Sequence, residues 1–212
     1  MREILMLIME LLGTVAFAVS GTLVAACCGL DLFGVLTVGT ITAVGGGVIR
    51  DLIIGQIPPA IFSKPEILVL VLVTSLVVFI VAFINSKKIK DLRLKIERIN
   101  IFFDALGLAA FSVTGVEVTC AAGYSDNAVL AVVLGVITGV GGGVLRDVLV
   151  NEKPYILVKH IYAVASLIGA VVYYFVGIYF GNELIGTIIS VLLTITIRML
   201  AAKFRWNLPK VM

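Results

Sequence analysis

The chain contains 212 residues, of which 61% are hydrophobic and 14% are charged, and its formal net charge is +3. Soluble domains carry about 45–50% apolar and about 25% charged residues, so the composition excludes a soluble enzyme and a disordered chain. A helix needs about 20 apolar residues to cross the hydrocarbon of a bilayer, and the stretches between the apolar runs are too short to fold alone. We therefore expect an all-α integral membrane protein.

Apolar runs separated by turn-forming residues predict seven transmembrane helices. Glycine, proline and asparagine mark several of the breaks, as at Gly29, Pro58 and Asn127. In chain order, the expected spans cover residues 4–27, 34–54, 67–84, 102–122, 128–150, 160–180 and 184–202.

The longest polar stretch, residues 85–100, follows the third span and contains six basic residues. The positive-inside rule favours a cytoplasmic loop here over a nucleic-acid or lipid-binding segment. Lys153, Lys159 and the tail after the last span fall on the same side, whereas the other side has little beyond Arg2 and Lys64. We expect a multi-pass protein of the inner or plasma membrane, with its N-terminus outside, its C-terminus in the cytoplasm and no nucleic-acid partner.

A duplication organises the chain. Residues 13–21 (GTVAFAVSG) match residues 107–115 (GLAAFSVTG), and residues 42–51 (TAVGGGVIRD) match residues 138–147 (TGVGGGVLRD). The offsets are 94 and 96 residues. Each unit holds three expected spans, an odd number, so the second copy must enter the membrane from the opposite face. The sequence predicts a 3+3 inverted repeat plus one extra helix.

The expected organisation has four parts. They are a first repeat at residues 1–84, a basic cytoplasmic linker at 85–101, a second repeat at 102–180, and the extra helix with a basic tail at 181–212.

Three consecutive glycines fall near the middle of the second and fifth spans. The triplets are Gly45, Gly46, Gly47 and Gly141, Gly142, Gly143. Glycine costs a helix interior about 1 kcal/mol relative to alanine, so we expect a kink or an unwound turn at each triplet. An unwound turn would expose the carbonyl groups of Gly45 and Gly141 to a transiently bound monovalent cation. The alternative is that the glycines only allow two helices to pack closely.

An arginine and an aspartate follow each triplet, as Arg50-Asp51 and Arg146-Asp147. Ionisable residues within membrane spans are costly and indicate function by default, although a structural ion pair is an equal alternative. Adjacent residues point in different directions on a helix, so we expect each charge to pair with a residue on another span. By the inverted topology, the two pairs should lie in opposite halves of the membrane.

Further polar residues within the spans could form a lining that favours cations. These are Glu10, Ser20, Thr42, Asp104, Thr114, Glu117 and Thr138. The alternative for the serine and threonines is a hydrogen bond back to their own helix. The single histidine, His160, is expected at the membrane interface, and the cysteines have no metal-ligand spacing. No catalytic arrangement is found, so neither an enzyme nor a bound cofactor is expected.

The paired GGGV[IL]RD blocks on the second and fifth spans resemble those of the TRIC (trimeric intracellular cation) channel family, especially its prokaryotic branch. The chain also resembles bacterial membrane proteins with two glycine-transporter domains. The TRIC resemblance covers about residues 4–200 and implies a homotrimer in the lipid bilayer. Each subunit would hold its own potassium-permeable pore, with the kinked glycine helices at the constriction and no soluble protein partner.

One departure from the family concerns lipid regulation. Animal members carry a Lys-Glu-Val motif tied to phosphoinositide binding, whereas this chain has Val116-Glu117-Val118 and no long lysine-rich tail. The resemblance therefore implies neither phosphoinositide regulation nor residence in the reticulum.

Two functions remain open from the sequence. The first is a channel for monovalent cations such as K⁺ or Na⁺, with a pore in each subunit. The alternative is a secondary transporter of a small zwitterion such as glycine, because an inverted repeat with broken helices serves both activities. A structural protein packed through small residues is a third, weaker interpretation.

Overall fold

The computed structural model describes residues 2–84, 93–158 and 161–206. Within these ranges the chain is helical with no β-strand. Residues 85–92 of the expected basic loop, Lys159, His160 and the last six residues lie outside the described residues.

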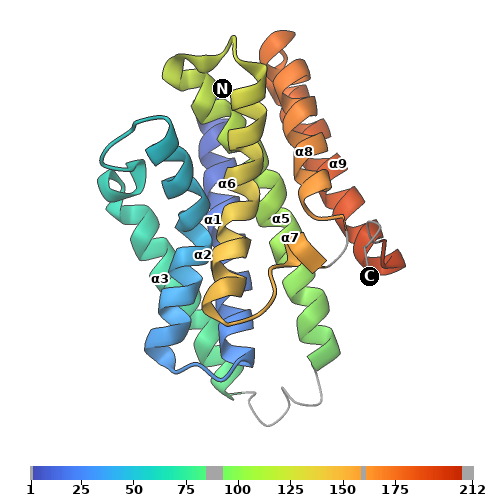
Figure 1. The fold of residues 1–212 in the computed structure, drawn as a ribbon. Helices are drawn as coiled ribbons and strands as arrows, with labels where there is room; N and C mark the ends of the chain where they lie inside the picture. The colour runs from blue at the N-terminus through green and yellow to red at the C-terminus, as the bar shows by residue number, and fades with distance from the viewer. Residues whose placement is uncertain (1, 85–92, 159–160, 207–212) are drawn as a thin grey trace.

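Six of the described helices are long and apolar enough to cross a membrane (Figure 1). They are α1 (Arg2–Cys27), α2 (Leu32–Ile53), α3 (Pro65–Ile84), α5 (Arg93–Thr119) with its extension η2 (Cys120–Tyr124), α6 (Ala128–Leu149) and α9 (Glu183–Phe204). A shorter apolar stretch joins α8 (Ala163–Val172) to the wider π-helical turns of η3 (Tyr173–Tyr179). The short helices η1 (Ala60–Ser63) and α7 (Tyr155–Val158) lie in connections.

The helix ends follow local chemistry. Asp31 begins α2 by accepting a hydrogen bond from the backbone N–H of Gly34 at 2.8 Å, and Asn127 begins α6 in the same way with Leu130 at 3.0 Å. Helix α5 begins at Arg93, so part of the stretch expected as linker is helical. Its first turns carry leucine, lysine, glutamate and arginine, which are strong helix formers.

Four helices form the centre of the bundle: α1, α2, α5 and α6. Helix α3 packs beside α1 and α2, and α8 and α9 cover the other flank against α5 and α6 (Figure 1). Helix α5 is the most enclosed of the long helices and α3 the least, with 72% and 17% of their apolar windows buried. Helices α2 and α6 run in opposite directions (Figure 1), and Arg50 and Arg146 lie in their last turns, so the two arginines lie toward opposite ends of the bundle, as expected.

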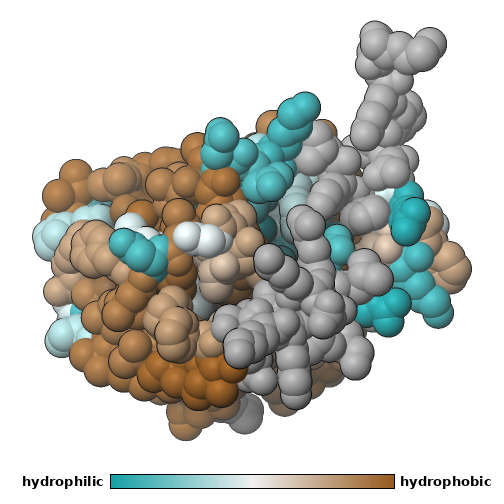
Figure 2. Space-filling model, turned by 90° about the horizontal axis from the view of Figure 1, so that it is seen from below, coloured by the Kyte–Doolittle hydropathy of each residue, from teal (hydrophilic) through white to brown (hydrophobic). Residues whose placement is uncertain are grey.

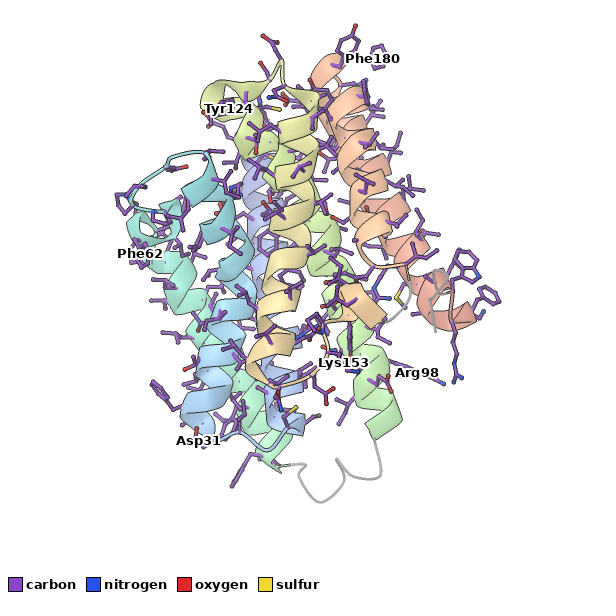
Figure 3. The ribbon with its side chains drawn as sticks, viewed as in Figure 1. Asp31, Phe62, Arg98, Tyr124, Lys153 and Phe180 are labelled. Carbon is purple, nitrogen blue, oxygen red and sulfur yellow. The ribbon has the colours of Figure 1, made fainter. Side chains whose placement is uncertain are left out.

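The two ends of the bundle carry different side chains. Tyr124 and Phe180 lie at the upper end, whereas Asp31, Arg98 and Lys153 lie toward the lower end (Figure 3). Seen from that lower end, hydrophobic residues cover the flank of α2 and α3, and hydrophilic ones gather toward the opposite side (Figure 2). Helix α1 begins toward the upper end of the bundle, and α9 ends lower down on its right flank (Figure 1).

Candidate functional site: a polar cavity beside two crossing glycine helices

Helices α2 and α6 cross in backbone contact at the glycine triplets. A Cβ atom on Gly46 would overlap the carbonyl oxygen of Thr138, and one on Gly142 would overlap the carbonyl oxygen of Thr42. A side chain at either position would therefore force the two backbones apart. The relationship is reciprocal, because the two glycines and the two threonines are equivalent positions of the repeat. The glycines therefore allow two helices to pack closely, which the sequence left open as the alternative to an unwound turn.

The backbone remains α-helical through both triplets. The expectation of an unwound turn is therefore wrong, because the carbonyl groups of Gly45 and Gly141 stay within continuous helices. Packing between the two backbones compensates for the low helix propensity of glycine. A bend of the helix axes at the triplets stays a prediction.

The threonines beside the triplets bond to their own helices. The Thr42 hydroxyl donates to the carbonyl oxygen of Val38 and the Thr138 hydroxyl to that of Leu134, both at 2.6 Å. Both side chains are fully buried and neither lines the cavity described next. For these two threonines, the alternative of a hydrogen bond back to their own helix, which the sequence left open, is therefore the one observed.

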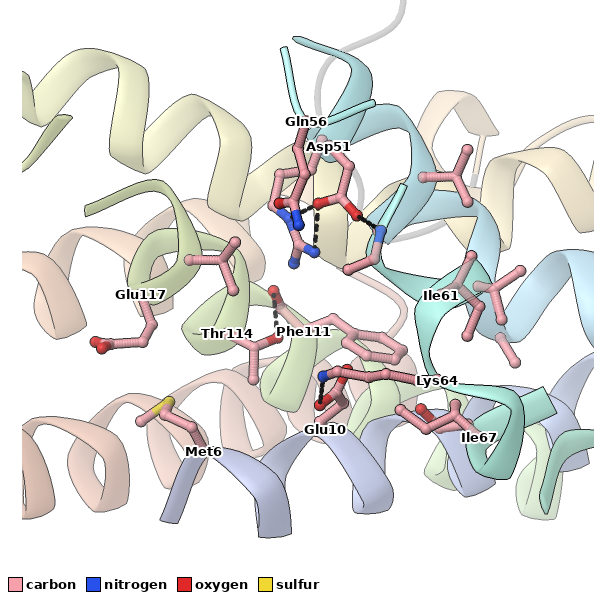
Figure 4. Close-up of a pocket in the computed structure, with 18 residues that line it drawn as sticks. Met6, Glu10, Asp51, Gln56, Ile61, Lys64, Ile67, Phe111, Thr114 and Glu117 are labelled. Atoms are coloured by element: carbon pink, nitrogen blue, oxygen red, sulfur yellow. Dashed lines mark hydrogen bonds and ion pairs between the residues drawn. The ribbon is translucent and has the colours of Figure 1, made fainter. Parts of the chain in front are cut away.

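A cavity of about 310 Å³ opens between α1, α2, α5 and the connection from α2 to α3 (Figure 4). It contains six of the residues that the sequence selected, drawn from both repeats: Glu10, Gly47, Arg50, Asp51, Thr114 and Glu117. It reaches the surface, because the side chains of Glu10 and Lys64 in its wall are 32% and 40% exposed. We call it the upper cavity.

Two ion pairs face each other across the upper cavity (Figure 4). The Lys64 ammonium lies 2.8 Å from Glu10, and the Arg50 guanidinium lies 2.7 Å from Asp51. The other oxygen of Asp51 accepts a hydrogen bond from the backbone N–H of Ala60 at 2.9 Å. The expectation that Arg50 would pair across to another span is wrong, because its long side chain folds back onto the neighbouring carboxylate.

Glu117 completes the wall of the upper cavity. Its carboxylate accepts hydrogen bonds from the Arg2 Nε and the Tyr173 hydroxyl, each at 2.6 Å. Arg2 also lies 3.1 Å from Glu183 at the start of α9. Three carboxylates and two cationic side chains therefore line the upper cavity, an excess of one negative charge that favours cations.

The equivalent charges of the second repeat form a closed cluster. Arg146 donates to Asp104 at 2.7 Å, to Asp147 at 2.8 Å and to the Ser20 hydroxyl at 2.6 Å. Ser20 in turn donates to Asn100 at 2.7 Å. Arg146 and Asp104 have no exposed surface. The prediction that Arg146 pairs with a residue on another span is therefore confirmed by Asp104. Arg146 also pairs with its neighbour Asp147. We call this set the Arg146 cluster.

A smaller cavity of about 190 Å³, the lower cavity, lies beyond the Arg146 cluster toward the opposite end of the bundle. Its wall includes the carboxylates of Glu97, Asp147 and Glu152, with Cys28 and Tyr155. Desolvation raises the pKa of the Tyr155 phenol above its ordinary value, so this group is neutral near pH 7.

Several residues of the site escaped the sequence analysis. Lys64 was seen only as a charge on the outer side, and Asn100 gave no signal. Arg198 and Tyr162 were also missed: both are buried, with the guanidinium carbon 4.9 Å from the ring centroid. The long separation between Lys64 and Glu10, 54 residues, leaves no local pattern that could reveal such a pair.

These features define a class: a helical membrane protein with two related halves and polar cavities at both ends of a glycine-mediated crossing. The chain belongs to the family of membrane proteins described by the glycine transporter model, which matches residues 7–82 and 101–177. The inner membrane protein YadS of Escherichia coli, of the UPF0126 group, is 38% identical over 95% of this chain and 93% of its own. YvgT of Bacillus subtilis is 33% identical over 95% and 94%.

Solved TRIC channels share the fold. A prokaryotic TRIC channel crystallised in 0.5 M KCl superposes with a TM-score of 0.85 at 35% identity, over 97% of this chain and 100% of that one. The TRIC orthologue from Rhodobacter sphaeroides superposes with a TM-score of 0.84 at 30% identity, over 94% and 98%. These relatives are membrane proteins and cation channels rather than enzymes, and this chain is a multi-pass membrane protein.

Proposed function

We propose that this protein is a channel for monovalent cations, permeable to K⁺, with a conduction path in each subunit. The observation that carries the proposal is the agreement with a solved TRIC cation channel over 97% of the chain. The path would run from the upper cavity past the glycine crossing to the lower cavity. The excess of carboxylates in both cavities supports selectivity for cations.

The proposed constriction is the glycine crossing together with the Arg146 cluster. The helices are unbroken and the cluster is buried, so conduction would require the triplets to act as hinges. Glycine suits this role because it has no side chain to restrict backbone rotation. Arg50, Asp51, Arg146 and Asp147 would flank the constriction from opposite ends.

The proposed architecture is the 3+3 inverted repeat with a seventh spanning helix. The reciprocal contacts of Gly46 and Gly142 support it, as does the shorter apolar stretch from Ala163 to Tyr179 at the place of the sixth span. The predicted boundaries at residues 84, 101 and 180 belong to this proposal.

The proposed assembly is a homotrimer in the cytoplasmic membrane. A solved relative is described as a trimeric channel, and YadS is an inner membrane protein. We propose that the N-terminus is outside and the C-terminus is in the cytoplasm. Arg98 and Lys153 at one end of the bundle support this orientation through the positive-inside rule.

Planar-bilayer recording of the purified protein tests the channel. Discrete ohmic steps in asymmetric KCl, with a reversal potential close to that of K⁺, are expected. A protein that takes up glycine saturably into vesicles without any conductance would contradict the proposal.

A second candidate function is the secondary transport of a small zwitterion such as glycine. Two observations favour it: the glycine transporter model matches both halves, and the Arg146 cluster closes one side while the other side is open. Uptake of radiolabelled glycine into proteoliposomes, with and without a K⁺ or proton gradient, tests this candidate directly.

A further inference from the structure

The two halves of the protein hold the same set of polar groups in two different arrangements. The repeat offset of 94 makes Asp104 equivalent to Glu10 and Thr114 equivalent to Ser20, while the offset of 96 makes Arg146 equivalent to Arg50. In the second half, Arg146 reaches a carboxylate on α5 and a hydroxyl on α1. The equivalent contacts in the first half would join Arg50 to Glu10 on α1 and to Thr114 on α5.

Those first-half contacts are absent among the described residues, although all three side chains line the same cavity. Glu10 is held by Lys64 at 2.8 Å, and Arg50 is held by Asp51 at 2.7 Å. The Thr114 hydroxyl donates a long hydrogen bond of 3.5 Å to the carbonyl oxygen of Phe111. The upper cavity therefore occupies the space that the Arg146 cluster fills in the other half.

We infer that the protein has a second conformation in which these arrangements are exchanged. Arg50 leaves its position over the cavity and joins Glu10 and Thr114, which closes the upper cavity. Arg146 releases Asp104 and Ser20, which extends the lower cavity toward the glycine crossing. The activity assigned by this exchange is alternating access, in which a central space opens to one side of the membrane at a time.

This inference rests on the second candidate function, secondary transport, rather than on the channel. It differs from a passive pore, in which both ends are open together. The two arrangements use equivalent arginine, carboxylate and hydroxyl groups, so the contacts that Arg146 loses are replaced by those that Arg50 gains. The Lys64–Glu10 pair, which must break, is partly exposed, and pairs of that kind are weak.

Two substitutions, alone and combined, separate the two conformations. Lys64→Ala frees Glu10 for Arg50 and should favour the exchanged conformation. Glu10→Gln removes the acceptor of Arg50 and should favour the conformation described here. In the double variant the effect of Lys64→Ala should disappear, because the freed carboxylate is no longer present. Glu66→Gln, an exposed carboxylate at the start of α3, is the matched control.

Thiol labelling in proteoliposomes measures the two cavities separately. In a chain with its three native cysteines replaced by serine, Val44→Cys reports on the upper cavity and Leu23→Cys on the lower cavity. Lys64→Ala should slow labelling at position 44 and speed labelling at position 23, each by about two- to fivefold, the range expected for breaking one partly exposed ion pair. Anionic and cationic reagents should agree, which excludes a local effect of the lysine charge.

A fourth variant tests the same exchange from the buried side. Asp104→Asn removes a partner of Arg146 and should shift both labelling rates in the same directions as Lys64→Ala. If this variant does not fold, the Lys64 and Glu10 variants still decide the question.

Two results would overturn the inference. One is a change of both labelling rates in the same direction, and the other is equal behaviour of Lys64→Ala with and without Glu10→Gln. Currents recorded from the same preparations distinguish alternating access from the channel. Opposed labelling changes without any K⁺ conductance would leave alternating access standing and reject the channel, whereas static labelling with an ohmic current would do the reverse.

Discussion

The rings of Phe17 on α1 and Phe111 on α5, equivalent positions of the two repeats, lie 5.3 Å apart between centroids with their planes at 52°. Each ring packs against the glycine that begins the other motif: Phe111 lies over Gly13, and Phe17 over Gly107. Only Phe111 lines the upper cavity. The two halves thus meet through a symmetric aromatic contact while their polar groups differ.

The glycine crossing predicts unequal effects for glycines of the two triplets. Gly142→Ala should lower stability by about 1–3 kcal/mol, because its methyl group would overlap the backbone of Thr42. Gly47→Ala should be neutral or slightly stabilising, since a Cβ there meets only the end of Arg50 at 3.7 Å and alanine favours the helix. Thermal unfolding in detergent measures both variants. A stability gain for both variants would show that helix propensity, rather than the crossing, determines the effect.

The two arginines predict a second contrast. Arg146→Ala should cost about 3–5 kcal/mol, because Asp104 and Asp147 would remain buried without their cationic partner. Arg50→Ala should cost much less, since Asp51 keeps the backbone N–H of Ala60 and faces a cavity. The same unfolding assay compares the pair. A larger loss for Arg50→Ala would contradict the burial of the Arg146 cluster.

Charge in the upper cavity predicts ion selectivity. Lys64→Gln removes one of two cationic side chains from the wall and should raise the K⁺/Cl⁻ permeability ratio roughly twofold at low salt. The gain should shrink in high salt, because ions screen the field of a partly exposed charge. Reversal potentials at two ionic strengths measure the effect, with Glu66→Gln as control. A ratio unaffected by Lys64→Gln at low salt would place the conduction path elsewhere.

The proposed orientation predicts which side of the membrane labels reach. In a cysteine-free background, Asp126→Cys in the connection before α6 should react with an impermeant thiol reagent on intact spheroplasts. Lys153→Cys, at the other end of α6, should react only after the membrane is opened. The reversed pattern would invert the proposed topology.

The sequence predicted the elements that depend on local pattern. Hydropathy located the six long helices to within a few residues at most ends, although α5 begins nine residues before its predicted start. The duplication identified the glycines of the crossing and the charges on either side of it. These features depend on composition and on the spacing of residues, and both can be determined from a single sequence.

The predictions that were wrong depended on which residues face each other in the folded protein. Glycine propensity predicted broken helices at Gly45 and Gly141, whereas the backbone of the partner helix supports them intact. Arg50 was expected to pair with another span, because the argument from helix geometry neglects the flexibility of arginine, which lets it reach Asp51. Asp104 and Arg146 are 42 residues apart, and only the fold brings their charges together.

The unequal surroundings of Arg50 and Arg146 have an evolutionary consequence. After a duplication, both copies begin with the same tolerance to mutation, but here one copy became fully enclosed among three bonded partners, whereas the other lines a cavity and bonds to its neighbour Asp51. Selection should therefore purge replacements at residue 146 far more strictly than at residue 50. Lineages descended from this ancestor could acquire new ion or solute preferences by drift at the permissive copy alone, while the strict copy preserved the scaffold.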